Sequence, residues 1–294
     1  MNFRTDLTLE RREILGIGEI SGVTSKEFTV ACAKVTEIEI TTEAGAETIG
    51  KPVGKYITIE VPEFAKNAEI LDGRLEAITT PLRALLPKEG AILVAGLGNT
   101  DITPDALGPK CAQKIFATRH ISESLAETLG LRKLRPVAAL TPGVLGKTGI
   151  EPAEIIAGTA QKTNPAAVII IDALAARQLS RLGNTIQMCD TGISPGSGVG
   201  NRRAEISQAT LGIPVIAVGV PTVVDAVTIA CEVFGEEENA NEYRRKFDEK
   251  YSKMMVTPRE IDLVTERAAK LVALAINCAL QPTLTPEDLL ELTL

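Results

Sequence analysis

The sequence has very little histidine and no tryptophan. Its 294 residues include a single histidine, His120. Catalytic triads and dyads built on imidazole need a histidine, and most zinc sites use at least one. We expect His120 to lie late in a helix at the surface. The acid–base groups of an enzyme with this sequence would therefore be carboxylates.

Cysteine is also scarce, and its spacing excludes the usual structural uses of this residue. The five cysteines are dispersed, and no two of them form a C-x-x-C pair. An odd, scattered set is typical of reduced thiols in a cytoplasmic compartment. We therefore expect no disulfide framework, no metal site and no other cofactor.

Long hydrophobic runs and excess positive charge are both lacking. The longest apolar stretch, residues 213–220, is far shorter than the ~20 residues of a membrane span. Charged residues at Arg4, Asp6 and Glu10 stand where a secretory signal would need an apolar run. The net charge is −7, from 31 Lys and Arg against 38 Asp and Glu, and an acidic surface repels phosphate backbones. We therefore expect a cytoplasmic protein that contacts neither membrane nor nucleic acid directly.

The hydrophobic pattern predicts an α/β fold with a mainly parallel sheet and helices on both faces. Residues 1–65 form a β-rich N-terminal segment, because polar and apolar residues alternate there with the period of two typical of strands. Residues 90–223 alternate short apolar runs with helical segments, as repeated βα units do. Residues 224–294 are expected to be helical. We expect these segments to form one domain over residues 1–294.

Individual elements can be placed by their apolar residues and by the residues that break them. A helix with a break at Pro81 is expected over residues 66–86. Further helices are expected over residues 104–120 (approximate bounds), 152–163, 173–182 and 258–279. Residues 236–253 are expected to form a charged, mostly exposed stretch. Core strands are expected over residues 91–95, 136–140, 166–171, 185–189 and 215–220.

Three aspartates follow predicted core strands. Asp105 opens the helix after the first of them, Asp172 ends the run 168–171, and Asp190 ends the run 185–189. Sites in open α/β sheets form at the carboxyl ends of strands. An aspartate near a helix start is also a common cap, which leaves both roles open for Asp105. A charge behind buried aliphatic residues is costly, so Asp172 needs a partner or a task. Two such acids in one cleft are suited to activating a water molecule.

Some familiar short motifs occur only in incomplete form. Residues 96–98 lack the third glycine of a dinucleotide fingerprint, and residues 146–148 lack the first glycine of a phosphate loop. Residues 192–196 match a serine elbow, but Pro195 cannot supply its backbone N–H donor. The letters D-T-G of pepsin-type proteases occur once, at residues 190–192, where those enzymes need two such loops. We therefore assign Asp190 a supporting role, in which it accepts local hydrogen bonds and braces the glycine-rich loop that follows.

Longer strings of the sequence resemble the germination protease of spore-forming bacteria over nearly the whole chain. These strings are R-T-D-L at 4–7, G-L-G-N at 96–99, T-P-D-A-L-G-P at 103–109, I-D-A-L-A-A-R at 171–177, D-T-G-I-S-P-G-S-G-V-G-N-R at 190–202 and M-M-V-T-P-R-E-I-D at 254–262.

The resemblance implies an endopeptidase that degrades small acid-soluble, DNA-coating spore proteins during germination. It implies a fold related to the hydrogenase-maturation peptidases, and two catalytic aspartates that map onto Asp105 and Asp172. The histidine ligand of the maturation peptidases has no counterpart here, so we expect no metal. The alternatives are a nickel-checking peptidase of the maturation type and a non-catalytic relative that binds spore proteins.

The family it resembles is made in the forespore as an inactive homotetrameric zymogen that removes a short propeptide. Only residues 1–3 precede Arg4, so the chain is either a mature-like form or one with almost no propeptide. The polar, glycine-rich loop 192–203 is expected to border the substrate groove, either as an anion-binding nest or as a turn beside the cleft. Residues expected to support catalysis or bind substrate are Asn99, Asp190, Ser197, Asn201 and Arg202.

Overall fold

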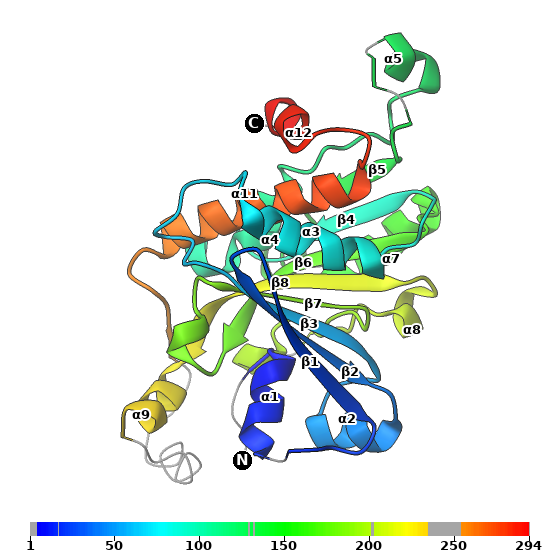
Figure 1. The fold of residues 1–294 in the computed structure, drawn as a ribbon. Helices are drawn as coiled ribbons and strands as arrows, with labels where there is room; N and C mark the ends of the chain where they lie inside the picture. Colours follow the sequence, from blue (N-terminus) through cyan, green and yellow to red (C-terminus); the bar gives the residue numbers. More distant parts are fainter. Residues whose placement is uncertain are drawn as a thin grey trace.

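A computed structural model describes residues 5–16, 18–128, 130–131, 133–200, 203–234 and 254–293, and the structural statements below concern these residues. The strands are β1 (Val23–Val30), β2 (Ala33–Ile40), β3 (Gly54–Glu60), β4 (Ile92–Gly96), β5 (Val137–Leu140), β6 (Ala167–Ala176), β7 (Thr185–Cys189), β8 (Val215–Asp225) and β9 (Met255–Val256). They form one sheet in the order β1-β2-β3-β7-β8-β6-β4-β5, and β9 pairs with β8 (Figure 1).

Helices cover both faces of this sheet. The α-helices are α1 (Thr8–Leu15), α2 (Glu43–Ile49), α3 (Gly73–Leu85), α4 (Leu107–Ala112), α5 (Glu123–Thr128), α6 (Leu145–Thr148), α7 (Pro152–Thr163), α8 (Gln208–Leu211), α9 (Ala226–Phe234), α11 (Ile261–Leu280) and α12 (Pro286–Thr293). The short 3-10 helices are η1 (Thr103–Asp105), η2 (Leu179–Arg181) and η3 (Ser197–Val199).

Alternate residues of the central strands build two separate cores. Ile169 and Ile171 of β6 belong to the larger core, which includes buried residues of α3, α4 and α11. These three helices lie together on one side of the sheet (Figure 1). Val168 and Ile170 belong to a smaller core with Ile156 of α7 on the other side. The expected α/β fold with helices on both faces is confirmed, and the central strands are apolar throughout because both faces are buried.

The sheet is mixed, and its parallel part is limited to four strands. The β8–β6, β6–β4 and β4–β5 pairs are parallel, whereas β1, β2, β3 and β7 are joined to one another and to β8 by antiparallel pairs. The short link between β6 and β7 carries only η2. A parallel return needs a crossover of a dozen residues or more. The chain therefore comes back antiparallel at β7, and the expectation of a mainly parallel sheet holds only for the central strands.

Two helix expectations were wrong because tertiary packing overrides local preference. The expected break at Pro81 is absent, and α3 continues through it with Ile78 and Leu82 fully buried. The helix expected over 173–182 is instead the end of β6 and the 3-10 helix η2. Alanine favours helix, but β6 pairs with β8 as far as Ala176.

The remaining helix expectations had mixed outcomes. The helix expected over 152–163 has the expected bounds, and the one expected over 258–279 is α11, at 261–280. The long helix expected after β4 is reduced to η1 and α4, and His120 lies in an exposed turn instead of late in a helix. The charged stretch expected over 236–253 lies outside the described residues.

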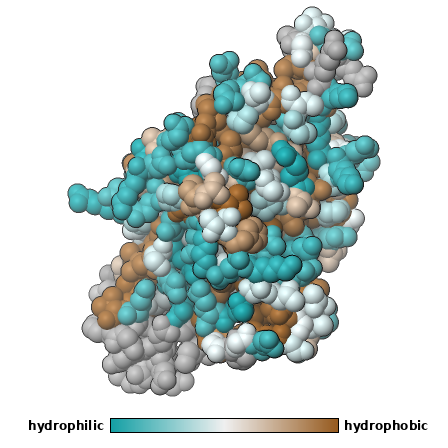
Figure 2. All heavy atoms as spheres, viewed as in Figure 1, coloured by the Kyte–Doolittle hydropathy of each residue, from teal (hydrophilic) through white to brown (hydrophobic). Residues whose placement is uncertain are grey.

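In the part of the chain that the structure describes, no helix combines the length and apolar character that crossing a membrane requires. The face drawn in Figure 2 is mainly hydrophilic, with smaller hydrophobic areas scattered over it. This pattern agrees with the lack of a long apolar run in the sequence.

Candidate active site

Asp172 lies where β6 outruns its neighbour β4. The β4–β6 pairing ends at Gly96 and Ile171, while β6 continues alongside β8 with Asp172 opposite Gly219. Asp172 is therefore the first residue of β6 past the end of β4, inside the strand and not at its end as the sequence suggested. Its side chain is only 6% exposed, and Oδ1 accepts a hydrogen bond of 2.9 Å from the Ala173 N–H.

Asp105 reaches the same region from the loop that follows β4. It is the last residue of η1, and its Oδ2 accepts a 2.8 Å hydrogen bond from the backbone N–H of Asn99. Gly98 has a φ of +120°, and a Cβ atom at this position would collide with the backbone oxygen of Asp105. Glycine is thus required here for a backbone conformation and a close approach that other residues cannot provide.

The two carboxyl groups line one cavity of about 370 Å³. Its walls come from the loop after β4, from residues 143–145, from the start of α7, from residues 195–196 and 203–206, and from Asp6 near the N-terminus. The structure therefore brings together Asp105 and Asp172, as the sequence led us to expect for acids following neighbouring strands.

Burial favours the protonated form of both acids, and repulsion by neighbouring carboxylates adds to this effect at Asp172. The pKa of Asp172 is raised well above its usual value, first because burial disfavours the charged form and then because Asp105 and Asp6 repel a second negative charge. Burial also raises the pKa of Asp105, and the Asn99 N–H opposes this by stabilising the carboxylate. Asp172 therefore holds its proton more tightly, and Asp105 is the more readily ionised of the two acids. Such a pair can hold one proton between two carboxyl groups, as acid–base chemistry on water requires.

Asp6 is a third acid at this cavity that the analysis of strand ends missed. Its backbone N–H donates to the Ala175 oxygen at 2.9 Å, and its Oδ2 accepts from the Ala175 N–H at 2.9 Å. Oδ1 accepts a 2.8 Å hydrogen bond from the Ser197 hydroxyl. The available signal was the string R-T-D-L, which carries part of the family resemblance but does not follow a predicted strand.

A second cavity of about 370 Å³ adjoins Asp6 on another side. Arg11 and Lys51 bring two basic side chains to it, and Gln187 and Cys189 of β7 form part of its wall. Burial lowers the pKa of Lys51, and the nearby Asp6 carboxylate partly opposes this effect. Asp6 thus lies between the cavity with Asp105 and Asp172 and the cavity with Arg11 and Lys51.

The residues expected to play supporting roles are placed differently from one another. Asn99 supports Asp105 through its backbone, and Ser197 lines the second cavity, where it binds Asp6. Asp190 is exposed, lines neither cavity, and accepts a 2.8 Å hydrogen bond from the Lys55 N–H at the start of β3. It therefore braces the β3–β7 pair, which brings Lys55 beside it, and in the described part of the glycine-rich loop no residue donates a hydrogen bond to its carboxylate. Asn201 and Arg202 lie outside the described residues.

The glycine-rich loop borders both cavities. Pro195, Gly196 and Arg203 contribute to the wall of the cavity with the two acids. Ser194 and Ser197 contribute to the second cavity. The described part of the loop thus borders the cavity that contains the two acids, and its contact with substrate stays a prediction.

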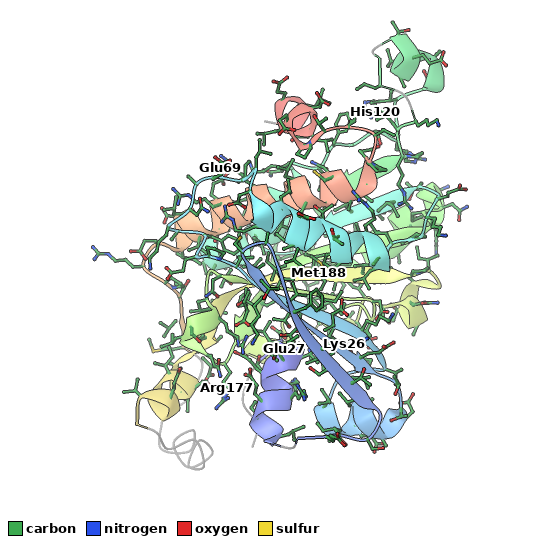
Figure 3. All side chains as sticks on the ribbon, in the orientation of Figure 1. Lys26, Glu27, Glu69, His120, Arg177 and Met188 are labelled. Atoms are coloured by element: carbon green, nitrogen blue, oxygen red, sulfur yellow. The ribbon has the colours of Figure 1, made fainter. Side chains whose placement is uncertain are left out.

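His120 does not belong to this region. In Figure 3 it lies near β5 and α5, far from Arg177, which directly follows β6. Among the described residues, no group of three or more His, Cys, Asp or Glu side chains could hold a metal ion.

Comparison with known proteins identifies the family. The family model for the germination protease matches residues 6–236. The germination protease of Clostridium perfringens strain ATCC 13124 is 44% identical, with 98% of each chain covered. That of Priestia megaterium is 38% identical and covers 97% of this chain and 95% of its own. The crystal structure of the NiFe hydrogenase maturation protease HycI from Thermococcus kodakarensis KOD1 is similar at a TM-score of 0.38 and 17% identity, over 67% of this chain and 98% of its own.

A family model that spans most of the chain and curated relatives that match over nearly their full length lead to the same assignment. Both acids of the cavity lie within the matched residues. This protein is a protease of spore germination, and the chain belongs to the germination protease family.

Proposed function

We propose that this protein is an endopeptidase that hydrolyses small acid-soluble spore proteins, with Asp105 and Asp172 activating a water molecule. The observation that carries the proposal is that both acids line the same cavity. Asp105 is half-buried there and Asp172 is buried. Their environments differ enough to divide the two roles.

In the proposed reaction, Asp105 is ionised and takes a proton from the attacking water. The Asn99 N–H stabilises the carboxylate in this state. Asp172 carries a proton because burial and its acidic neighbours disfavour its charge, and it donates that proton to the peptide carbonyl or to the leaving amine. When Asp172 donates to the carbonyl, Asp105 passes its proton to the leaving amine as the C–N bond breaks, and Asp172 takes a proton back from a hydroxyl of the tetrahedral intermediate. When Asp172 donates to the amine, the proton on Asp105 passes to Asp172. Either route restores the pair. The two acids titrate as a coupled pair.

Other properties of the proposal rest on the family resemblance. We propose that the protein acts in the cytoplasm of the forespore and spore core, as a homotetramer made as a zymogen, and that it needs no metal or other cofactor. Nucleic acid and membrane are not proposed as partners.

The test is incubation with a purified small acid-soluble spore protein, followed by mass spectrometry of the products. Asp105→Asn and Asp172→Asn should each lower the rate by ~10²–10⁴-fold, the usual contribution of a general acid or base. The matched control is Asp101→Asn, because Asp101 lies on the same loop but is exposed and paired with Lys147. Near-normal rates in either folded active-site variant would refute the mechanism.

Two further arms separate the alternatives. Exhaustive chelation should leave the rate unchanged, whereas a loss that nickel or zinc restores would support a metallopeptidase. Binding of the spore protein without cleavage by the wild-type protein would support a non-catalytic relative.

A further inference from the structure

The part of β6 that carries Asp172 has a strand edge that β4 does not cover. β4 pairs with β6 only as far as Ile171, while β8 pairs with β6 to Ala176 on the other side. Among the described residues, residues 172–176 of β6 therefore have a strand neighbour on one side only. Such an edge presents backbone N–H and C=O groups to any extended chain that reaches it.

The direction of these groups follows from the hydrogen bonds around them. The Ile171 oxygen accepts from the Leu97 N–H, on the side of β4, whereas the Val168 N–H donates to Pro214, on the side of β8. Peptide groups of alternate residues in a parallel strand point to opposite neighbours. Ala173 and Ala175 therefore direct their peptide groups to the side where β4 has ended. Ala173 and Asp172 also line the cavity that holds Asp105.

This edge already holds a piece of extended backbone in the structure. The Asp6 N–H donates to the Ala175 oxygen at 2.9 Å, which is a strand-like contact. The Asp6 carboxylate, at 2.9 Å from the Ala175 N, takes the place that a carbonyl oxygen of an added strand would take. The Ala173 N–H is occupied by the Asp172 side chain at 2.9 Å, and this leaves the Ala173 oxygen as the next acceptor along the edge.

We infer that the substrate binds as an added β-strand along Ala173 and Ala175 of β6, in the place now partly held by Asp6. This inference rests on the proposed function and names the form in which that site accepts its substrate, an extended peptide recognised through its backbone. A peptide on this edge runs past Asp172 within the cavity that Asp105 also lines. The N-terminal segment has to leave Ala175 before the substrate pairs there.

The test uses a synthetic peptide that spans the bond cleaved in a small acid-soluble spore protein. Each backbone amide is replaced in turn by an ester, which removes one N–H without adding bulk. The oxygens of Ala173 and Ala175 should accept from two N–H groups of the peptide that are two residues apart. We therefore expect kcat/KM to fall ~10-fold at those two positions and to change less than ~3-fold at the position between them, given the usual net contribution of one hydrogen bond. Equal losses at all positions, or no losses, would overturn the inference.

A second measurement separates this inference from the proposed function. The same peptides are titrated against the Asp172→Asn variant, which binds them without cleaving them. The Kd should rise at the same two ester positions at which kcat/KM falls in the wild type. Cleavage by the wild-type protein with no such pattern refutes strand addition alone. If the pattern appears in Kd but the wild-type protein cleaves nothing, the proposed function alone is refuted. If the peptides are neither bound nor cleaved, both proposals are refuted.

A variant of the chain gives an independent readout. Asp6→Ala removes the carboxylate bonded to the Ala175 N–H and weakens the hold of the N-terminal segment on the edge. We expect KM for the unmodified peptide to fall several-fold, and the control Asp101→Ala to leave KM unchanged. An unchanged or raised KM in Asp6→Ala would show that the segment does not occupy the place of the substrate, which overturns the inference.

Discussion

Replacing Asp172 by asparagine should abolish activity and yet stabilise the fold at neutral and alkaline pH. The asparagine has nearly the same shape, and its side-chain oxygen can still accept the hydrogen bond from Ala173. It carries no charge to desolvate in a site where only 6% of the side chain is exposed. The structure therefore predicts that the carboxyl group of Asp172, which catalysis needs, lowers the free energy of unfolding of the protein.

The pH dependence of this cost follows from the direction of the pKa shift. The pKa of Asp172 is raised in the folded state above the value of ~3.9 in an unfolded chain. Between those two values the folded protein holds one proton more than the unfolded one, so the free energy of unfolding falls as pH rises, by ~1.4 kcal/mol per pH unit. The stability is fully present below the unfolded pKa, and the loss is complete above the folded pKa. Asp172→Asn lacks this dependence.

Urea denaturation at a series of pH values between ~3.5 and 9 measures the effect. The free energy of unfolding of Asp172→Asn minus that of the wild type should increase as pH rises above the unfolded pKa and should level off only above the raised folded pKa. Asp101→Asn is the control, because Asp101 is exposed and the Lys147 ammonium lowers its pKa, which gives the opposite sign. A difference between Asp172→Asn and the wild type that stays constant with pH would refute the assignment of Asp172 as the proton-holding acid.

Further predictions concern residues around the site. Asp190→Asn should keep peptidase activity within ~3-fold of wild type, because its carboxylate lines neither cavity, so a loss approaching that of Asp105→Asn would contradict this placement. Glu10→Gln should lower the free energy of unfolding by ~1–3 kcal/mol in urea. Each oxygen of the buried Glu10 carboxylate, which also lies beside Arg181, accepts one backbone N–H, and an amide keeps only one of these acceptors. This cost opposes the relief of removing a charge that burial disfavours, since burial raises the pKa of Glu10. The control Glu13→Gln removes a more exposed partner of the same arginine and should cost less than ~1 kcal/mol. Alkylation of accessible thiols should leave activity unchanged, since Cys32 is the exposed one among the four cysteines whose state is described, and inactivation would reveal a thiol requirement.

The sequence predicted the acid pair because its signal is local. Asp172 directly follows a run of buried aliphatic residues, and Asp105 follows the loop after another such run. The carboxyl ends of adjacent parallel strands meet at one edge of a sheet, so their proximity followed from topology.

The extension of β6 could not be read in the same way. Residues 173–176 are three alanines and a leucine, which have high helix propensity. Their strand conformation depends on β8, whose pairing residues lie 47 or 48 positions further along the chain. Asp6 was missed for the same physical reason, because its hydrogen bonds to Ala175 join the N-terminus to the middle of the chain. Partners that are distant in sequence leave no periodic pattern for local analysis to detect.

The unequal length of neighbouring strands accounts for the main features of the site. If β4 ran as far as β6, its backbone would cover Ala173 and Ala175, and the cavity beside Asp172 would be filled. Because β4 ends at Gly96, the chain turns away through Gly98 and brings Asp105 back to the opened space. Because β8 continues to Asp225, β6 stays extended and Asp172 stays buried in a rigid strand. The same mismatch thus keeps one acid buried with a raised pKa, makes room for the other, and leaves without a β4 partner the strand edge on which we propose that the substrate binds.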